Sequence, residues 1–207
     1  MTEISEANRI EQLGLDKGIQ QLKLLWELNL IERYKMILKK RIQQLESQKP
    51  KLSQKELSIK LSAIKTHVKE NKERKIEFLK KLLPSYNLSA QLNIIKENQR
   101  FLDQLKKEFN KAKVDHEAYE VTRINYAKKI ESAKRNIQKI QRVALFYFQM
   151  LKDRAITLEI NQDKLSHQFH KDDITKEEYY RMREDIEKEK AQLRKQLKFL
   201  KKSVLTI

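Results

Sequence analysis

The stretch "IESAKRNIQKIQRVALFYFQMLKDRAITLEINQDKL", from Ile130 to Leu165, decides the fold class of this chain. Apolar residues recur in it at every seventh position: Ile130, Ile137, Ala144, Leu151, Leu158 and Leu165. A sustained seven-residue repeat is typical of helices that pack along a left-handed coiled-coil seam. Because no Gly or Pro interrupts the stretch, we expect one long helix here.

The composition of the whole chain agrees with long helices. Only two Gly and two Pro occur among 207 residues, and charged residues make up 36% of the chain. Such a composition favours helical bundles over a compact α/β enzyme. The chain has no Cys, which excludes disulfides, thiolate metal sites and Cys nucleophiles and is compatible with a reducing compartment.

Breaks near Pro50, Pro84, Asp115 and Asp172 divide the chain into five expected helices, over residues 5–48, 53–83, 89–112, 116–169 and 175–204. Two of the breaks carry the same start signal. Ser53 with Glu56, and Thr175 with Glu178, have the spacing of a capping box, and each box lies between two apolar residues that can staple the turn. Recurrence of this signal indicates either a duplication or the same physical solution used again.

Short turns make consecutive helices antiparallel, so the helix over 89–112 should cover the first half of the long helix and the helix over 175–204 the second half. The expected fold is therefore all-α, an elongated bundle of about five antiparallel hairpin and coiled-coil helices, with one long helix near 116–169. We expect two domains. Residues 1–112 form hairpins of three helices with breaks near Pro50 and Pro84, and residues 113–207 form the long helix and a returning helix with a break near Asp172.

The segment "VALFYF", Val143 to Phe148, is apolar all round, and the ends of the two covering helices should meet near residues 141–148. A helix that is apolar on every side is usually buried on every side. We therefore expect a core junction here, and a partner-binding or membrane-inserting patch is the alternative. A kink at this place is also left open.

Signals for chemistry are sparse. The chain has no Gly-rich phosphate loop, no metalloprotease motif and no nucleophile elbow. His167 and His170 are spaced for a metal site, but His is also favoured at a helix C-terminus. We expect no enzyme activity, no catalytic or metal-binding residues, no cofactor and no small-molecule substrate.

The formal net charge is +17, which favours polyanionic partners such as nucleic acid or anionic lipid, although lysines can also simply solvate helix surfaces. No base-reading motif is visible. The candidate polyanion-binding residues are the basic clusters Lys39, Lys40, Arg41, Lys80, Lys81, Lys128, Lys129, Lys201 and Lys202.

The region "FHKDDITKEEYYRMREDIEKEKAQLRKQLKFLKK", Phe169 to Lys202, resembles the C-terminal hairpin of core subunits of the ESCRT-I complex. Ile174, Thr175, Glu177 and Tyr179 match the turn of that hairpin, and the helix over 116–169 corresponds to its stalk. The resemblance covers about the last 90 residues and implies an assembly role in a membrane-remodelling or trafficking complex. The ubiquitin-binding domain typical of one such subunit is absent.

These patterns together predict a non-catalytic scaffold or adaptor that joins itself or partner helices through coiled-coil seams. The candidate partner-binding residues are Ile130, Ile137, Val143, Phe146, Tyr147, Phe148, Leu151, Leu158, Tyr179, Ile186, Leu193 and Leu200. Polar residues along the seams would select register or partner, or would lie at the exposed margins; they are Asn71, Lys75, Arg154 and Asn161. No signal peptide or membrane-spanning segment is visible, which predicts a cytoplasmic or peripheral membrane location. The alternative function is non-specific binding of anionic membranes or nucleic acid.

Overall fold

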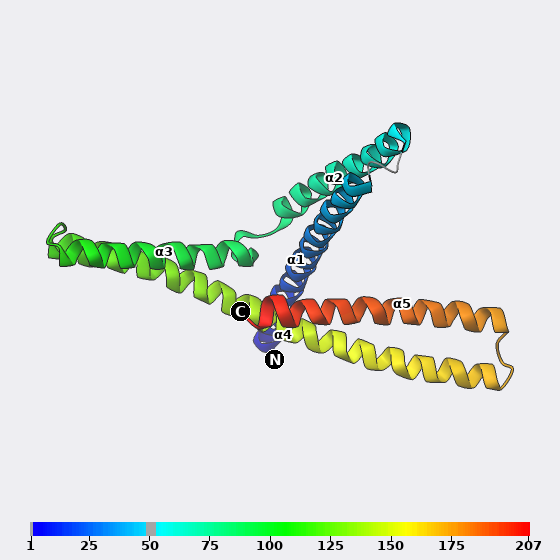
Figure 1. Cartoon of the computed structure of the whole chain (residues 1–207). Helices are drawn as coiled ribbons and strands as arrows, with labels where there is room; N and C mark the ends of the chain where they lie inside the picture. Colours follow the sequence, from blue (N-terminus) through cyan, green and yellow to red (C-terminus); the bar gives the residue numbers. More distant parts are fainter. Residues whose placement is uncertain (1, 49–52) are drawn as a thin grey trace. The chain divides into compact units, whose positions relative to one another are not determined.

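Five α-helices dominate the chain, as the sequence predicts (Figure 1). The structure is a computed structural model that describes residues 2–48 and 53–207. The helices are α1 (Thr2–Gln48), α2 (Gln54–Lys81), α3 (Leu88–Asn110), α4 (His116–His170) and α5 (Lys176–Leu200). A 3₁₀ turn (Pro84–Tyr86) precedes α3, and a π-helical turn (Lys201–Leu205) follows α5. The described residues contain no strand, so the predicted all-α class is confirmed, whereas the break predicted at Pro50 lies outside them.

The predicted helix starts form as their sequence implies. The Ser53 hydroxyl accepts from the backbone N–H of Glu56 at 3.3 Å, and Thr175 accepts from Glu178 at 3.3 Å. Each glutamate in turn accepts from the backbone N–H of its cap residue, which completes both capping boxes. These bonds lower the pKa of both carboxyls, mainly through the Ser53 hydroxyl in α2 and mainly through the Thr175 backbone N–H in α5. The carboxylate of Asp115 caps α4 without a matching box.

The corners of the α3–α4 and α4–α5 hairpins carry the same aromatic pair. Phe109 stacks on Tyr119 with ring centroids 4.2 Å apart, and Phe169 stacks on Tyr179 at 4.4 Å. In both corners the Phe belongs to the last turns of the incoming helix and the Tyr to the first turn of the outgoing helix. Aromatic stacking of this kind adds about 0.5–1.5 kcal/mol beyond the buried area, so it holds each pair of helix ends together.

The backbone of the two corners is also the same. Ala112 and Asp172 both lie in the left-handed region, with φ of 52° and 57°. In each corner the backbone N–H of the next residue donates to a carbonyl near the end of the incoming helix. Lys113 N–H donates to the Glu108 carbonyl at 3.0 Å, and Asp173 N–H donates to the Gln168 carbonyl at 3.0 Å. This is the hydrogen-bond pattern of a helix that ends in a left-handed residue.

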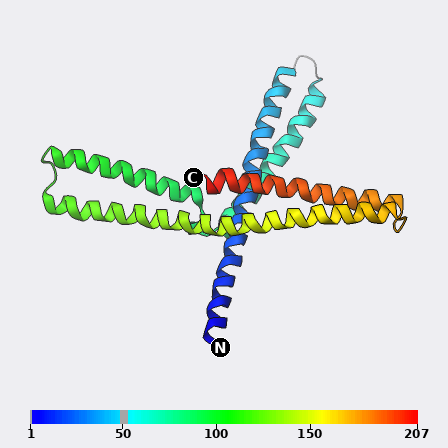
Figure 2. The same ribbon diagram turned by 90° about the horizontal axis from the view of Figure 1, so that it is seen from below.

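Helix α4 is continuous over 55 residues and serves two neighbours. Figures 1 and 2 show α3 beside its first half and α5 beside its second half. Polar contacts set the pairing: Asn136 donates to Gln91 of α3 at 3.1 Å, and Arg154 donates to Glu189 of α5 at 2.7 Å. The seven-residue row predicted from the sequence is buried throughout, at Ile130, Ile137, Ala144, Leu151, Leu158 and Leu165.

The start of α3 and the C-terminal turn after α5 contact α4 within about one and a half helical turns of each other. Asn136 contacts the start of α3, and Gln141 donates to the carbonyls of Val204 and Ile207 at 3.4 and 3.3 Å. The expected meeting of the two covering helices is therefore found, a little before the predicted residues 141–148.

The prediction that "VALFYF" is buried on every side is wrong. Val143, Ala144 and Tyr147 are buried, but Leu145 is 58% exposed and Phe146 44% exposed. Burial of Tyr147 raises the pKa of its phenol. The buried residues face one side of α4 and the exposed ones the other, because covering helices on one side leave the opposite side bare.

The chain divides into two compact units, one of residues 1–19 and 88–207 and the other of residues 20–87. This division differs from the predicted boundary between 112 and 113, because α3 packs along α4. The unit of residues 20–87 holds the α1–α2 hairpin, whose core is built on Leu38, Leu45 and Ile64, with Ile42, Leu57 and Leu61 packed against them.

Gln21 ties the end of α2 to α1. Its side-chain oxygen accepts from the Leu83 N–H at 2.7 Å, and its side-chain nitrogen donates to the Lys81 carbonyl at 3.5 Å. Gln21 is buried, so it satisfies backbone groups that would otherwise be unpaired where the helix ends.

Candidate protein-binding groove

A groove of 390 Å³ lies between α1 and α2 within the unit of residues 20–87. We call it the α1–α2 groove. Its lining residues come from one face of each helix and are Ile31, Glu32, Lys35, Leu38, Val68, Asn71, Lys72, Lys75, Ile76 and Leu79.

The floor of the α1–α2 groove is apolar. Ile31 and Leu38 are buried in the hairpin, whereas Val68, Ile76 and Leu79 of α2 are 43%, 46% and 42% exposed. The spacing of the three α2 residues places them on one helix face. They form a row of branched apolar side chains that the hairpin leaves half open to water, which is the kind of surface that a further helix covers.

The rim of the α1–α2 groove carries more positive than negative charge. Three lysines line it, Lys35, Lys72 and Lys75, against one carboxylate, Glu32. Lys75 donates to Glu32 across the hairpin, and Lys35 lies 4.0 Å from the same carboxylate. The hydrogen bond from Lys75 is the main cause that lowers the pKa of Glu32.

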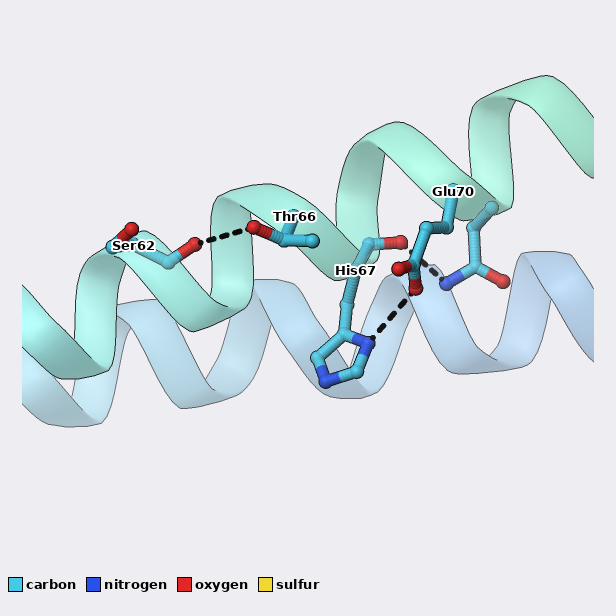
Figure 3. Close-up of polar contacts among 5 residues, drawn as sticks. Ser62, Thr66, His67 and Glu70 are labelled. Carbon is cyan, nitrogen blue, oxygen red and sulfur yellow. Dashed lines mark hydrogen bonds and ion pairs between the residues drawn. The ribbon is translucent and has the colours of Figure 1, made fainter.

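A second hollow of 430 Å³ lies between the same helices toward their connection. It is more polar, because Tyr34, Arg41, Lys60 and His67 line it beside the hairpin core. Figure 3 shows the α2 side of this region, where the His67 ring points toward α1 and its Nδ1 lies 3.2 Å from the Glu70 carboxylate. The His67 ring also meets the Tyr34 ring edge-on at 6.4 Å.

Two backbone-directed bonds belong to α2 itself. The Thr66 hydroxyl donates to the Ser62 carbonyl at 3.2 Å, as Figure 3 shows. The Asn71 amide donates to the His67 carbonyl at 2.8 Å. Asn71 therefore uses a side-chain donor on its own helix, although it also lines the α1–α2 groove.

Helix α4 carries a second exposed apolar row, in the other unit. Its members are Leu145, Phe146, Met150, Ile156 and Ile160. They lie on the side of α4 away from the buried seven-residue row, so the hairpins of α4 also leave an apolar face uncovered.

Most of the predicted partner-binding residues are buried within the chain. These are Ile130, Ile137, Val143, Tyr147, Leu151, Leu158, Leu193 and Leu200, while Phe148, Tyr179 and Ile186 are half-buried and Phe146 is exposed. Contacts within the chain thus occupy the seams that were expected to meet a partner. A role for these residues toward a partner stays a prediction.

The polar seam residues fall into two groups. Arg154 and Asn161 lie exposed at the margin of the α4–α5 hairpin, whereas Asn71 and Lys75 are half-buried in the α1–α2 groove. The alternative of an exposed margin therefore describes the first pair, whereas the second pair lines the α1–α2 groove.

The predicted polyanion-binding residues are all exposed but do not form one site within either unit. They are Lys39, Lys40, Arg41, Lys80 and Lys81 in the α1–α2 hairpin, and Lys128, Lys129, Lys201 and Lys202 in the other unit. Lys81 lies beside Gln21, about 27 Å along α1 from Lys39 at about 1.5 Å per residue. Gln141, beside Val204, lies about 18 Å along α4 from Lys129 on the same measure.

The prediction of no metal, cofactor or catalytic residues stays a prediction. Among the residues that the structure describes, no three His, Asp or Glu side chains gather where they could hold a metal ion. His167 and His170 lie in the last turn of α4, the place where a helix dipole favours them.

The sequence reasoning did not single out Ile76 and Leu79. Their signal is a second apolar row on α2, offset from the row of Leu57, Leu61 and Ile64 that forms the hairpin core. Val68 has the spacing of that core row as well, so spacing alone does not separate the two rows. Exposure of Val68, Ile76 and Leu79 together identifies the groove.

None of the described helices is both long and apolar enough to cross a membrane. Comparison with family models, with curated proteins and with solved structures finds no match to this chain. The resemblance of residues 169–202 to ESCRT-I core subunits therefore stays a prediction.

Proposed function

We propose that the chain is a non-catalytic helical scaffold or adaptor that assembles with partner helices through faces that its own hairpins leave uncovered. The observation that carries this proposal is the α1–α2 groove, with its half-open apolar row at Val68, Ile76 and Leu79. Fully burying such a side chain from an exposed state contributes about 1.5–3 kcal/mol. Because these three are already more than half buried, a helix seated on them would gain roughly half of that from each.

The arrangement of α4 supports the same proposal. A helix with one neighbour buries one stripe, and α4 has one covering helix along each half. Its exposed apolar row, which includes Leu145, Ile156 and Ile160, is a further face on which a scaffold could add a helix.

Light scattering and affinity purification test the proposal on the full chain. We expect either a defined oligomer or a stoichiometric complex with a co-purifying protein. A monodisperse monomer over a wide concentration range, with no protein retained in stoichiometric amount, would contradict it.

We also propose a setting for this scaffold, a membrane-remodelling or trafficking complex. What supports it is the resemblance of residues 169–202 to ESCRT-I core subunits, in which a stalk helix ends in a hairpin of the same form. The test is co-purification with trafficking components and location of the tagged chain in cells. If no trafficking component co-purifies with the chain, the proposed membrane-remodelling or trafficking role is contradicted, whereas the scaffold function is not.

A second candidate function is non-specific binding of polyanions, and the net charge of +17 favours it. The lysines at 39, 40, 128, 129, 201 and 202 are exposed and available to phosphates. Sedimentation with anionic vesicles and gel shifts with nucleic acid, each at low and high salt, would separate the two functions. Strong retention at low salt that disappears at high salt supports polyanion binding, and no retention at low salt excludes it.

A further inference from the structure

The charge of the α1–α2 groove specifies the partner more narrowly than its apolar floor does. Lys35 and Lys75 share one carboxylate, that of Glu32. Lys72 is exposed and has no ion-pair partner among the described residues. The rim is therefore positive after its own ion pair is counted, and it is set beside apolar side chains that need a cover.

We propose that the α1–α2 groove binds an amphipathic helix whose apolar stripe is flanked by acidic residues. The inference rests on the proposed scaffold function and names the class of partner. The apolar stripe would seat on Val68, Ile76 and Leu79, and the flanking carboxylates would meet Lys35 and Lys72.

The length of the groove fits such a helix. From Val68 to Leu79 it follows α2 for about 16 Å at about 1.5 Å per residue, which is three helical turns. Three turns present apolar anchors spaced three, four and seven residues apart, the pattern by which amphipathic helices bind in grooves.

The same charge disfavours a second copy of this chain as the occupant. Two α1–α2 grooves packed face to face would bring Lys35 and Lys72 of one copy against the same lysines of the other. The net charge of +17 opposes this association further at low salt. An acidic helix removes this repulsion, whereas a second copy adds to it.

The probe is a fluorescent synthetic peptide of about 21 residues, three heptads with Leu at the seam positions and Glu at the flanking positions. Two companions have Lys in place of every Glu, or Ser in place of every Leu. Like charges at the flanking positions keep each peptide from pairing with itself. Binding to the full chain is measured by fluorescence anisotropy at low and at physiological salt.

Four variants of the full chain locate the site. Ile76→Asp places a carboxylate on the floor, and Ile59→Asp makes the same change outside the groove, about 26 Å away along α2 at about 1.5 Å per residue, where Ile59 is 60% exposed. Lys72→Glu reverses the charge of the rim, and Lys55→Glu makes the same change near the start of α2, outside the groove. Circular dichroism is the control for folding, and only variants that keep the helix content of the wild type are compared.

We expect the Glu peptide to bind at least tenfold more tightly than the Lys peptide at low salt, and the Ser peptide not to bind. Ile76→Asp should weaken the Glu peptide at least tenfold, and Ile59→Asp should leave it unchanged. Lys72→Glu should narrow or reverse the preference between the Glu and Lys peptides, and Lys55→Glu should not.

Four results would overturn the inference. Equal binding of the Glu and Lys peptides removes the acidic specificity. If the Ser peptide binds as tightly as the Glu peptide, the interaction is electrostatic and does not need the apolar floor. If Ile76→Asp and Ile59→Asp weaken the Glu peptide equally, the peptide does not bind in the α1–α2 groove. A dimer that forms without peptide and that Ile76→Asp dissociates assigns the groove to a second copy; this result refutes the acidic helix but leaves the scaffold function standing.

Discussion

Replacing Ala with Gly should change the free energy of unfolding in opposite directions at two places, the α3–α4 corner and the interior of α4. Ala112 has φ of 52°, in the left-handed region. This conformation costs an L-residue about 1–2 kcal/mol, a cost that Gly avoids. Gly loses about 0.5–1 kcal/mol more than Ala in chain entropy on folding. The balance predicts that Ala112→Gly raises the free energy of unfolding by about 0.5–1 kcal/mol.

Ala127→Gly is the matched control, because it removes the same methyl group from an exposed residue that lies far from either end of α4. There Gly should lower the free energy of unfolding by about 1 kcal/mol. Urea unfolding followed by helix circular dichroism measures both, and the two midpoints should move in opposite directions. If Ala112→Gly lowered the urea midpoint below that of the wild type by as much as Ala127→Gly does, the left-handed conformation of Ala112 would be refuted.

Three further substitutions test other parts of the fold. Gln21→Ala should destabilise the α1–α2 hairpin by about 1–3 kcal/mol and speed hydrogen exchange at the Leu83 amide, because that N–H loses its acceptor; unchanged exchange would contradict this role. Thr175→Ala should cost about 1 kcal/mol. The pKa of Glu178 is lowered in the folded chain, so its contribution to stability is present above the ordinary value of 4.5 and is lost as pH falls through the lower folded-state pKa. Because Thr175→Ala removes the hydroxyl bond but keeps the backbone N–H, the larger cause of the lowered pKa, it should weaken this acid dependence without abolishing it. If acid unfolding curves of the Thr175→Ala chain and the wild type ran parallel, the Thr175 hydroxyl would contribute nothing to this linkage. Ile140→Ala should cost about 2–5 kcal/mol, since Ile140 is fully buried, and a loss below about 1 kcal/mol in the same urea assay would show that it is not core.

The helix starts and the α4 seam could be predicted because short-range physics decides them. Ser53 and Thr175 cap helices through residues three positions away, and the seven-residue row from Ile130 to Leu165 is a property of one helix. The left-handed conformation of Ala112 could not be read in the same way, because Ala gives no sign of it.

Which apolar stripe meets a neighbour is a tertiary question, and there the sequence was insufficient. Leu145 and Phe146 looked buried because the segment around them is apolar all round, yet α4 is covered on one side only. Val68 fitted both the core row and the groove row of α2, and Ile76 was not singled out. Periodicity shows that a face is apolar, but only the packing shows whether the chain itself covers that face.

Site-specific photo-crosslinking tests the central claim most directly. A photoreactive amino acid in place of Ile76 lies on the floor of the α1–α2 groove, and the same residue in place of Ile59 lies exposed outside the groove, near the start of α2. With the full chain in its cells of origin, we expect one discrete crosslinked product from position 76, mapped to an acidic amphipathic helix, and none from position 59. Equal products from both positions, or none from position 76, would contradict assembly through the groove.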